Sequence, residues 1–225
     1  MIIWPPSMRK VYTISATIRS WLALISIVCI GYFFIIVLIS HVLRPDVQPL
    51  RNAVSNYATG PYGFLMVSAF FALALAMAAI VLGLAGELPP TRRTQYGATL
   101  LFIASVGLVV VGIFPGDVHV PHPPATITGL IHWIAAGTSF LSITIAAFLF
   151  SDSFKEHKDW QSFHRPALGL SIASVIATAV FGVLALTGWV GLGERIYLPV
   201  ALLWPLLTTI RMKALISRKI TLRHA

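Results

Sequence analysis

The sequence predicts an all-α, polytopic membrane protein that folds as a bundle of six transmembrane helices. Hydrophobic residues make up 57% of the 225-residue chain, and charged residues only 10%. A soluble domain carries about 25% charged residues, so this chain lacks the polar surface that it would need in water. It also contains six apolar runs that reach the length of about 20 residues with which a helix crosses a bilayer.

Short polar connections separate the six runs, which are Trp21–Leu43, Gly63–Ala85, Gln95–Phe114, Gly129–Phe150, Pro166–Thr187 and Ile196–Ile216. The apolar part of a secretory signal is about 7–15 residues long. Because the first run is longer, we expect it to be retained as a helix. The chain then divides into a cytoplasmic N-terminal segment (1–20), a six-helix membrane domain (21–216) and a basic cytoplasmic tail (217–225).

Prolines and charged residues mark the connections between the runs. Pro61 and Pro166 suit the first turn of a helix, because proline lacks the N–H group that this turn leaves unbonded. The mixed charges between Ser151 and Arg165 predict a solvated connector, and Trp160 within it suits the membrane interface.

The distribution of Lys and Arg predicts the orientation in the membrane. Cytoplasmic loops of membrane proteins are enriched in these residues. With a cytoplasmic N-terminus, only three of the sixteen basic residues, Arg44, Arg51 and Arg195, lie on the outer side. The other thirteen lie on the cytoplasmic side: Arg9, Lys10, Arg19, Arg92, Arg93, Lys155, Lys158, Arg165, Arg211, Lys213, Arg218, Lys219 and Arg223. We therefore expect a multi-pass protein of the cell membrane with both termini in the cytoplasm.

The same distribution explains the net charge of +9 without a nucleic-acid partner, because the basic residues stand between apolar runs and form no stripe. Cys29 is the single cysteine, so one chain can form neither a disulfide nor a cysteine-based metal site. Membrane lipids are the partners that this composition predicts. The sequence selects no oligomeric state.

Polar side chains gather on the predicted outer side, above all between His41 and Gly63. An ionisable cluster at membrane depth is a functional-site hypothesis by default. The candidate ligand-binding residues are His41, Arg44, Arg51, Ser55, Tyr57, Asp117, His132 and Arg195.

Arg195 begins the sixth run, where the helix dipole disfavours a cation and the nearby hydrocarbon makes an unpaired guanidinium costly. Asp117 ends the third run on the same side. We therefore predict an ion pair between Arg195 and Asp117, with His41 and His132 lining the same cavity. Glu194 suits a helix N-terminus and is explained by that position alone.

These residues also follow a family pattern. The chain contains the motifs HxxRPxxxPL…SxYxxGxxG from His41, FPxD from Phe114, GxxH from Gly129 and GxxER from Gly191. In this order they resemble the bacterial and archaeal membrane family catalogued as domain of unknown function 998, from about Trp21 to Ile216. The resemblance implies a six-helix membrane protein and supplies no activity. The Pro-rich loop that carries His119 and His122 does not match the pattern.

The leading functional hypothesis is an outer cavity that binds an anionic lipid head group or a small amphiphile. Arg44, Arg51 and Arg195 would supply guanidinium groups for a phosphate or carboxylate, and the adjacent hydrocarbon would take an acyl chain. This hypothesis requires no cofactor.

Two alternatives use the histidines. A metal-dependent hydrolase at the outer leaflet would bind zinc through three N or O ligands and keep a position open. Its ligands would come from Asp117, His119, His122 and His132. A b-type haem protein would use His41 and His132 as axial ligands.

The orientation is tested with reporters fused after Ala225. We expect a phosphatase that folds only outside the cytoplasm to be inactive there, and a fluorescent protein that matures in the cytoplasm to be active. The opposite pair of results would contradict the predicted topology.

Overall fold

The computed structural model describes residues 14–117 and 124–224, with side chains up to residue 219. Over these residues the chain forms six long helices and one short 3-10 helix, η2 (Val54–Ala58). The long helices are α1 (Ala16–Leu43), α2 (Gly63–Ala85), α3 (Arg92–Ile113), α4 (Ile127–Phe154), α5 (Gln161–Leu186) and α6 (Val190–His224). All six are long and apolar enough to cross a membrane. The predicted fold class is confirmed.

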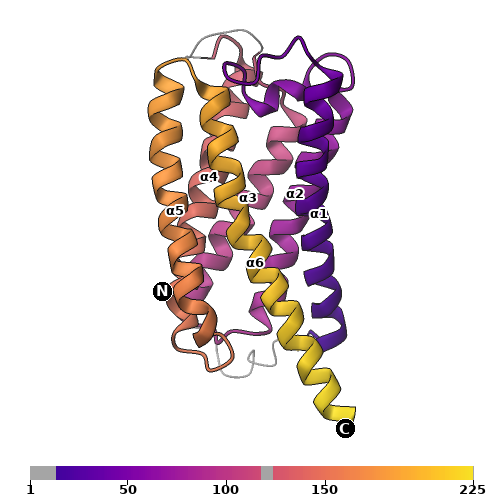
Figure 1. Ribbon diagram of the computed structural model, residues 1–225, viewed down its shortest axis with the longest axis vertical. Coiled ribbons are helices and arrows are strands. Elements are labelled where there is room, and N and C mark those ends of the chain that lie inside the picture. Colours follow the sequence, from indigo (N-terminus) through magenta and orange to yellow (C-terminus); the bar gives the residue numbers. More distant parts are fainter. Residues whose placement is uncertain (1–13, 118–123, 225) are drawn as a thin grey trace.

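The helices form a ring in chain order (Figure 1). Each helix packs against the next one, and α6 also packs against α1, which closes the ring. Short connections produce this up-and-down arrangement. In Figure 1, α1 begins and α6 ends at the same end of the bundle, which we call the terminal end. The opposite end, with the α1–α2, α3–α4 and α5–α6 connections, is the loop end. Which side of the membrane each end faces stays a prediction.

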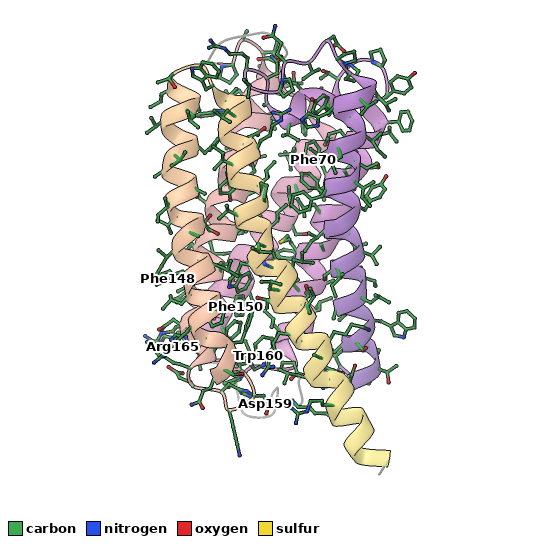
Figure 2. The ribbon with its side chains drawn as sticks, viewed as in Figure 1. Phe70, Phe148, Phe150, Asp159, Trp160 and Arg165 are labelled. Atoms are coloured by element: carbon green, nitrogen blue, oxygen red, sulfur yellow. The ribbon has the colours of Figure 1, made fainter. Side chains whose placement is uncertain are left out.

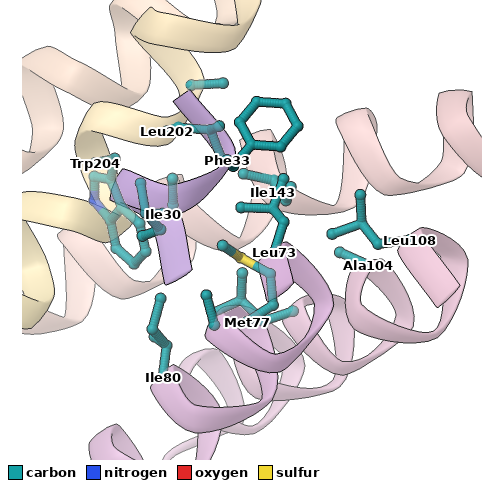
Figure 3. Packing of buried hydrophobic residues seen from close by; sticks show 14 of the residues in the cluster. Ile30, Phe33, Leu73, Met77, Ile80, Ala104, Leu108, Ile143, Leu202 and Trp204 are labelled. Atoms are coloured by element: carbon teal, nitrogen blue, oxygen red, sulfur yellow. The ribbon is translucent and has the colours of Figure 1, made fainter. Parts of the chain in front are cut away.

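Apolar side chains from all six helices form the core cluster, part of which is shown in Figure 3. α5 contributes least, since Ala167 and Ala177 are its only buried apolar residues among those described. The core residues labelled in Figure 3 are Ile30, Phe33, Leu73, Met77, Ile80, Ala104, Leu108, Ile143, Leu202 and Trp204.

Small residues let neighbouring helices approach closely. A methyl group on Gly107 of α3 would collide with the hydroxyl of Ser139 on α4. The Ser139 hydroxyl donates to the carbonyl of Ala135 at 2.7 Å and lies 3.4 Å from the carbonyl of Ala104 on α3. Small residues and hydroxyl groups are typical of helix contacts in membranes, where apolar surface alone favours the lipid as much as another helix.

The α4–α5 connection differs from the prediction. α4 continues to Phe154 and α5 already begins at Gln161, so Pro166 lies inside α5 instead of in its first turn. Trp160 is fully buried, and its ring stacks on Phe154 with the centroids 4.6 Å apart. Figure 2 labels Trp160 and Asp159 near the terminal end of the bundle. The predicted interfacial position of Trp160 is therefore wrong, because this ring packs inward while charged neighbours such as Lys158 remain exposed.

A buried carboxylate joins several elements at the terminal end. Glu87, just after α2, forms ion pairs with Arg19 of α1 at 2.7 Å and with Lys219 of α6 at 3.0 Å. Lys219 also pairs with Asp159 of the α4–α5 connection at 3.0 Å, and its hydrogen bond lowers the pKa of that carboxyl. The charges of this cluster compensate one another.

The close approach of α3 and α4 generates a stability prediction. Gly107→Ala should lower the melting temperature in detergent, because overpacking costs about 1–3 kcal/mol. Gly182→Ala is the matched control, since a methyl group on Gly182 of α5 would meet no atom within 4 Å. The control should be neutral or slightly stabilising, because alanine is a better helix former than glycine by up to about 1 kcal/mol. Equal melting temperatures for the two variants would contradict the contact.

Candidate functional site

The α1–α2 connection folds over the loop end, and Arg44 joins the beginning of this connection to its end. The Nε and Nη2 groups of Arg44 donate to the two carboxylate oxygens of Asp46 at 2.8 and 2.7 Å. Its Nη1 donates to the carbonyls of Thr59 and Pro61. The hydrogen bonds to Asp46 raise the pKa of Arg44. Arg44 is buried, and four of its five N–H groups bond to acceptors within the connection itself.

Arg195 holds the second half of the connection against α6. Its Nε donates to Nε2 of His41 at 3.0 Å, and its Nη1 donates to the carbonyls of Asn52 and Gly191, both at 3.0 Å. Its Nη2 donates to the hydroxyl of Tyr57 at 3.3 Å, and Tyr57 is fully buried. The acceptors on Asn52, Gly191 and Tyr57 are uncharged groups. Arg195 therefore joins α6 to the end of α1 and to η2.

The hydrogen bonds of His41 assign its tautomer. Its Nδ1 lies 2.6 Å from the carbonyl of Val37, which can only accept, so Nδ1 carries a proton. Its Nε2 faces an N–H group of Arg195, which can only donate, so Nε2 must be unprotonated. His41 is thus a neutral imidazole that uses both of its nitrogens within the protein.

The predicted ion pair between Arg195 and Asp117 is wrong. The carboxylate of Asp117 accepts hydrogen bonds from the backbone N–H groups of Ala125 and Thr126, at 2.8 and 3.1 Å, and from the Thr126 hydroxyl at 2.5 Å. The Thr126 hydroxyl bond is the main reason that the pKa of Asp117 lies below its ordinary value. Thr126 is the N-cap of α4, so Asp117 serves the start of that helix. The backbone N–H groups of Ala125 and Thr126, just before α4, therefore take the place that was predicted for the guanidinium of Arg195.

Arg51 joins the α1–α2 connection to the α5–α6 connection. Its Nη1 donates to the carbonyl of Gly188 at 3.3 Å, and its guanidinium carbon lies 4.0 Å from the ring centroid of Trp189. Unlike Arg44 and Arg195, Arg51 is exposed and keeps several N–H groups that bond to no described residue.

Glu194 is the site residue that the sequence reasoning missed. Its Oε2 accepts a hydrogen bond from the backbone N–H of Val54, the first residue of η2. Glu194 is buried, with only 7% of the residue exposed. A signal was present in the sequence. Glu194 shares one helical face, at spacings of three, four, seven and eight residues, with Tyr197, Leu198, Ala201 and Leu202, all of which are buried.

A small cavity lies between η2 and the helices at the loop end of the bundle. Its volume is about 30 Å³, which leaves room for about two water molecules. The walls are mainly apolar and aromatic, and Phe70, which lines the cavity, is labelled in the loop-end half of the bundle in Figure 2. Four side chains with hydrogen-bonding groups line it: Ser55 of η2, His132 of α4, and Glu194 and Tyr197 of α6. The Tyr197 hydroxyl donates to the carbonyl of Phe140 at 2.8 Å, so that group already has a partner in the wall.

His132 is fixed in this wall by the end of α3. It is 6% exposed, and its Nδ1 donates to the carbonyl of Phe114 at 2.8 Å. Phe114 is the C-cap of α3, so the imidazole bonds a carbonyl that follows the last turn of that helix. The structure therefore places His132 and Ser55 on the cavity, while His41, Tyr57 and Arg195 form the hydrogen-bonded group beside it.

The residues of the two alternative functions are distributed as follows. His119 and His122 lie outside the described residues. Among the residues that the structure describes, no group of three or more His, Cys, Asp or Glu side chains is placed to hold a metal ion. Of the two proposed haem ligands, His132 faces the cavity, and His41 would have to give up its bond to Arg195 to bind iron.

Comparison with known proteins gives one match. A family described as "Protein of unknown function (DUF998)" matches residues 27–211, which include all six helices in whole or in large part. No curated protein and no solved structure matches the chain. The matched segment contains every candidate site residue, from His41 to Arg195. Because the match covers most of its length, the chain belongs to the DUF998 family of membrane proteins.

Proposed function

We propose that this protein binds a single-chain amphiphile from the surrounding membrane, with the polar head at the loop end and the chain among the apolar walls of the cavity. The observation that carries the proposal is the convergence of Ser55, His132 and Glu194 on one otherwise apolar cavity. An apolar pocket with a few convergent polar groups is the usual form of a small-molecule site. Ionisable side chains within membrane spans are costly, which favours a functional role for them.

The hydrogen bonds of the arginines favour this cavity over the arginines as the place where the ligand head binds. Arg44 and Arg195 each use all but one of their N–H groups within the protein. Arg51 keeps free donors, but it is exposed and lies over Trp189 at the α5–α6 connection. An anionic head group would therefore bind outside the cavity, through Arg51, and not between three arginines.

The size of the cavity sets a condition on binding. A volume of about 30 Å³ holds no alkyl chain, since sites for drug-sized ligands measure about 300–1,000 Å³. The walls must therefore move when the ligand binds. η2 supplies Val54 and Ser55 to the cavity and belongs to a connection, not to a membrane-spanning helix, so its displacement would open the cavity at the loop end.

The proposal is tested by photolabelling in phosphatidylcholine vesicles. Three probes share a hexadecyl chain with a diazirine group and differ only in the head, which is a hydroxyl, a carboxylate or a primary ammonium. We expect at least one probe to label the cavity-lining segments of α4 and α6, around Ile143 and Leu198, as located by mass spectrometry of peptides.

Two variants fill the cavity, and one matched variant leaves it unchanged. Ala136→Phe and Ala201→Leu add bulk to cavity-lining positions and should reduce the labelling severalfold. Ala179→Phe adds the same bulk on the exposed face of α5 and should leave labelling unchanged. If no probe labels the cavity segments, or if folded filling variants are labelled like the wild type, the protein does not bind amphiphiles there.

A further inference from the structure

We infer that the head group bound in the cavity is a primary ammonium, which Glu194 recognises together with aromatic rings. The inference rests on the proposed function and adds the chemical class of the ligand. It reverses the sign of the charge that the sequence suggested, because it assigns recognition to the carboxylate in the cavity and not to the arginines, none of which lines it.

The first support is a buried carboxyl group that forms no ion pair among the described residues. Glu194 is 7% exposed, and the one hydrogen bond that it accepts from the described residues is the Val54 N–H on Oε2. None of the ion pairs among the described residues includes Glu194. Its neighbour Arg195 directs its guanidinium to His41, Asn52, Gly191 and Tyr57 instead. A buried carboxylate is costly unless it is paired, so Oε1 is available to a cationic donor.

The second support is the aromatic lining of the same cavity. Four rings line it: Phe33, Phe70, Phe140 and Tyr197. They lie in two pairs, Phe140 with Tyr197 at 4.6 Å between ring centroids and Phe33 with Phe70 at 6.4 Å. Aromatic faces attract ammonium groups, and the attraction strengthens when water is excluded. A carboxylate set among aromatic rings therefore suits an alkylammonium head, whereas a phosphate or carboxylate head would be repelled by Glu194.

The third support comes from the contrast with Glu87, the other buried glutamate. Glu87 has two cationic partners within the protein, Arg19 and Lys219. Both glutamates are buried to a similar degree, at 6% and 7% exposure. The protein thus supplies ion pairs to one buried carboxylate, whereas the other, which lines a cavity, forms none among the described residues.

The three photoreactive probes test the inference through their head groups. In wild-type protein the ammonium probe should label the cavity segments at least about tenfold more than the hydroxyl or carboxylate probe at equal membrane concentration, because a hydrogen bond between an ammonium and a carboxylate is roughly twice as strong as one between neutral groups. Glu194→Gln keeps an oxygen that can accept the Val54 N–H but removes the negative charge, and it should abolish the preference.

Asp117→Asn is the matched control. It removes one negative charge from the same end of the bundle, but Asp117 does not line the cavity, so the ammonium preference should remain. Should Glu194→Gln fail to fold, addition of unlabelled hexadecylamine to the wild type must still reduce labelling by the ammonium probe more than hexadecanol does.

Labelling by all three probes without an ammonium preference, or a preference that survives Glu194→Gln, would overturn the inference and leave amphiphile binding intact. Preferential labelling by the carboxylate probe would also overturn it and would point to Arg51, which lies outside the cavity. Failure of all three probes would instead reject the proposed function itself.

Discussion

A guanidinium group close to hydrocarbon must find an acceptor for nearly every N–H group, and this demand organises the loop end of the bundle. Arg195 meets it with groups from α1, from the α1–α2 connection and from α6 itself. Glu194, one residue earlier, projects about 100° away on the helix and accepts the first N–H of η2. Two adjacent side chains of α6 therefore hold the same connection from two directions, and the cavity lies on the Glu194 side.

The two ends of the bundle use charge in different ways. At the terminal end, Glu87, Arg19, Lys219 and Asp159 form ion pairs with one another, so the cluster joins helices and needs no other partner. At the loop end, the acceptors of Arg195 are neutral and Glu194 forms no ion pair among the described residues. Burial makes an uncompensated charge expensive wherever it occurs. The same chemistry is thus structural at one end and suited to a ligand at the other.

The sequence predicted the helices well because hydrocarbon thickness sets their length, and α2 has the predicted bounds, Gly63–Ala85. The helix ends were predicted less well, since they depend on caps and on packing. Trp160 is an example, because its charged neighbours suggested an exposed connection while its ring belongs to the core.

The sequence predicted most residues of the candidate site, but it did not predict which of them bond to one another. The sequence placed His41, Tyr57 and Arg195 on one side of the membrane, and the structure joins them by hydrogen bonds or ring contacts. It could not show that Asp117 would bond to the N–H groups at the start of α4. Glu194 was left out of the candidate site because a carboxylate is favourable at a helix N-terminus and no further role was sought for it. Its spacing from the buried residues Tyr197 and Leu198 nevertheless indicates a buried face.

The closure of the ring by α1 and α6 also sets an order in time. A chain is synthesised from its N-terminus, so η2, which lies between the first two helices, exists long before the last helix does. Until α6 inserts, the imidazole of His41 lacks Arg195, the N–H of Val54 lacks its carboxylate, and α1 lacks one of its neighbours. The cavity at the loop end is therefore complete only once α6 is in place, because Glu194, Tyr197 and Leu198 of that helix form part of its wall.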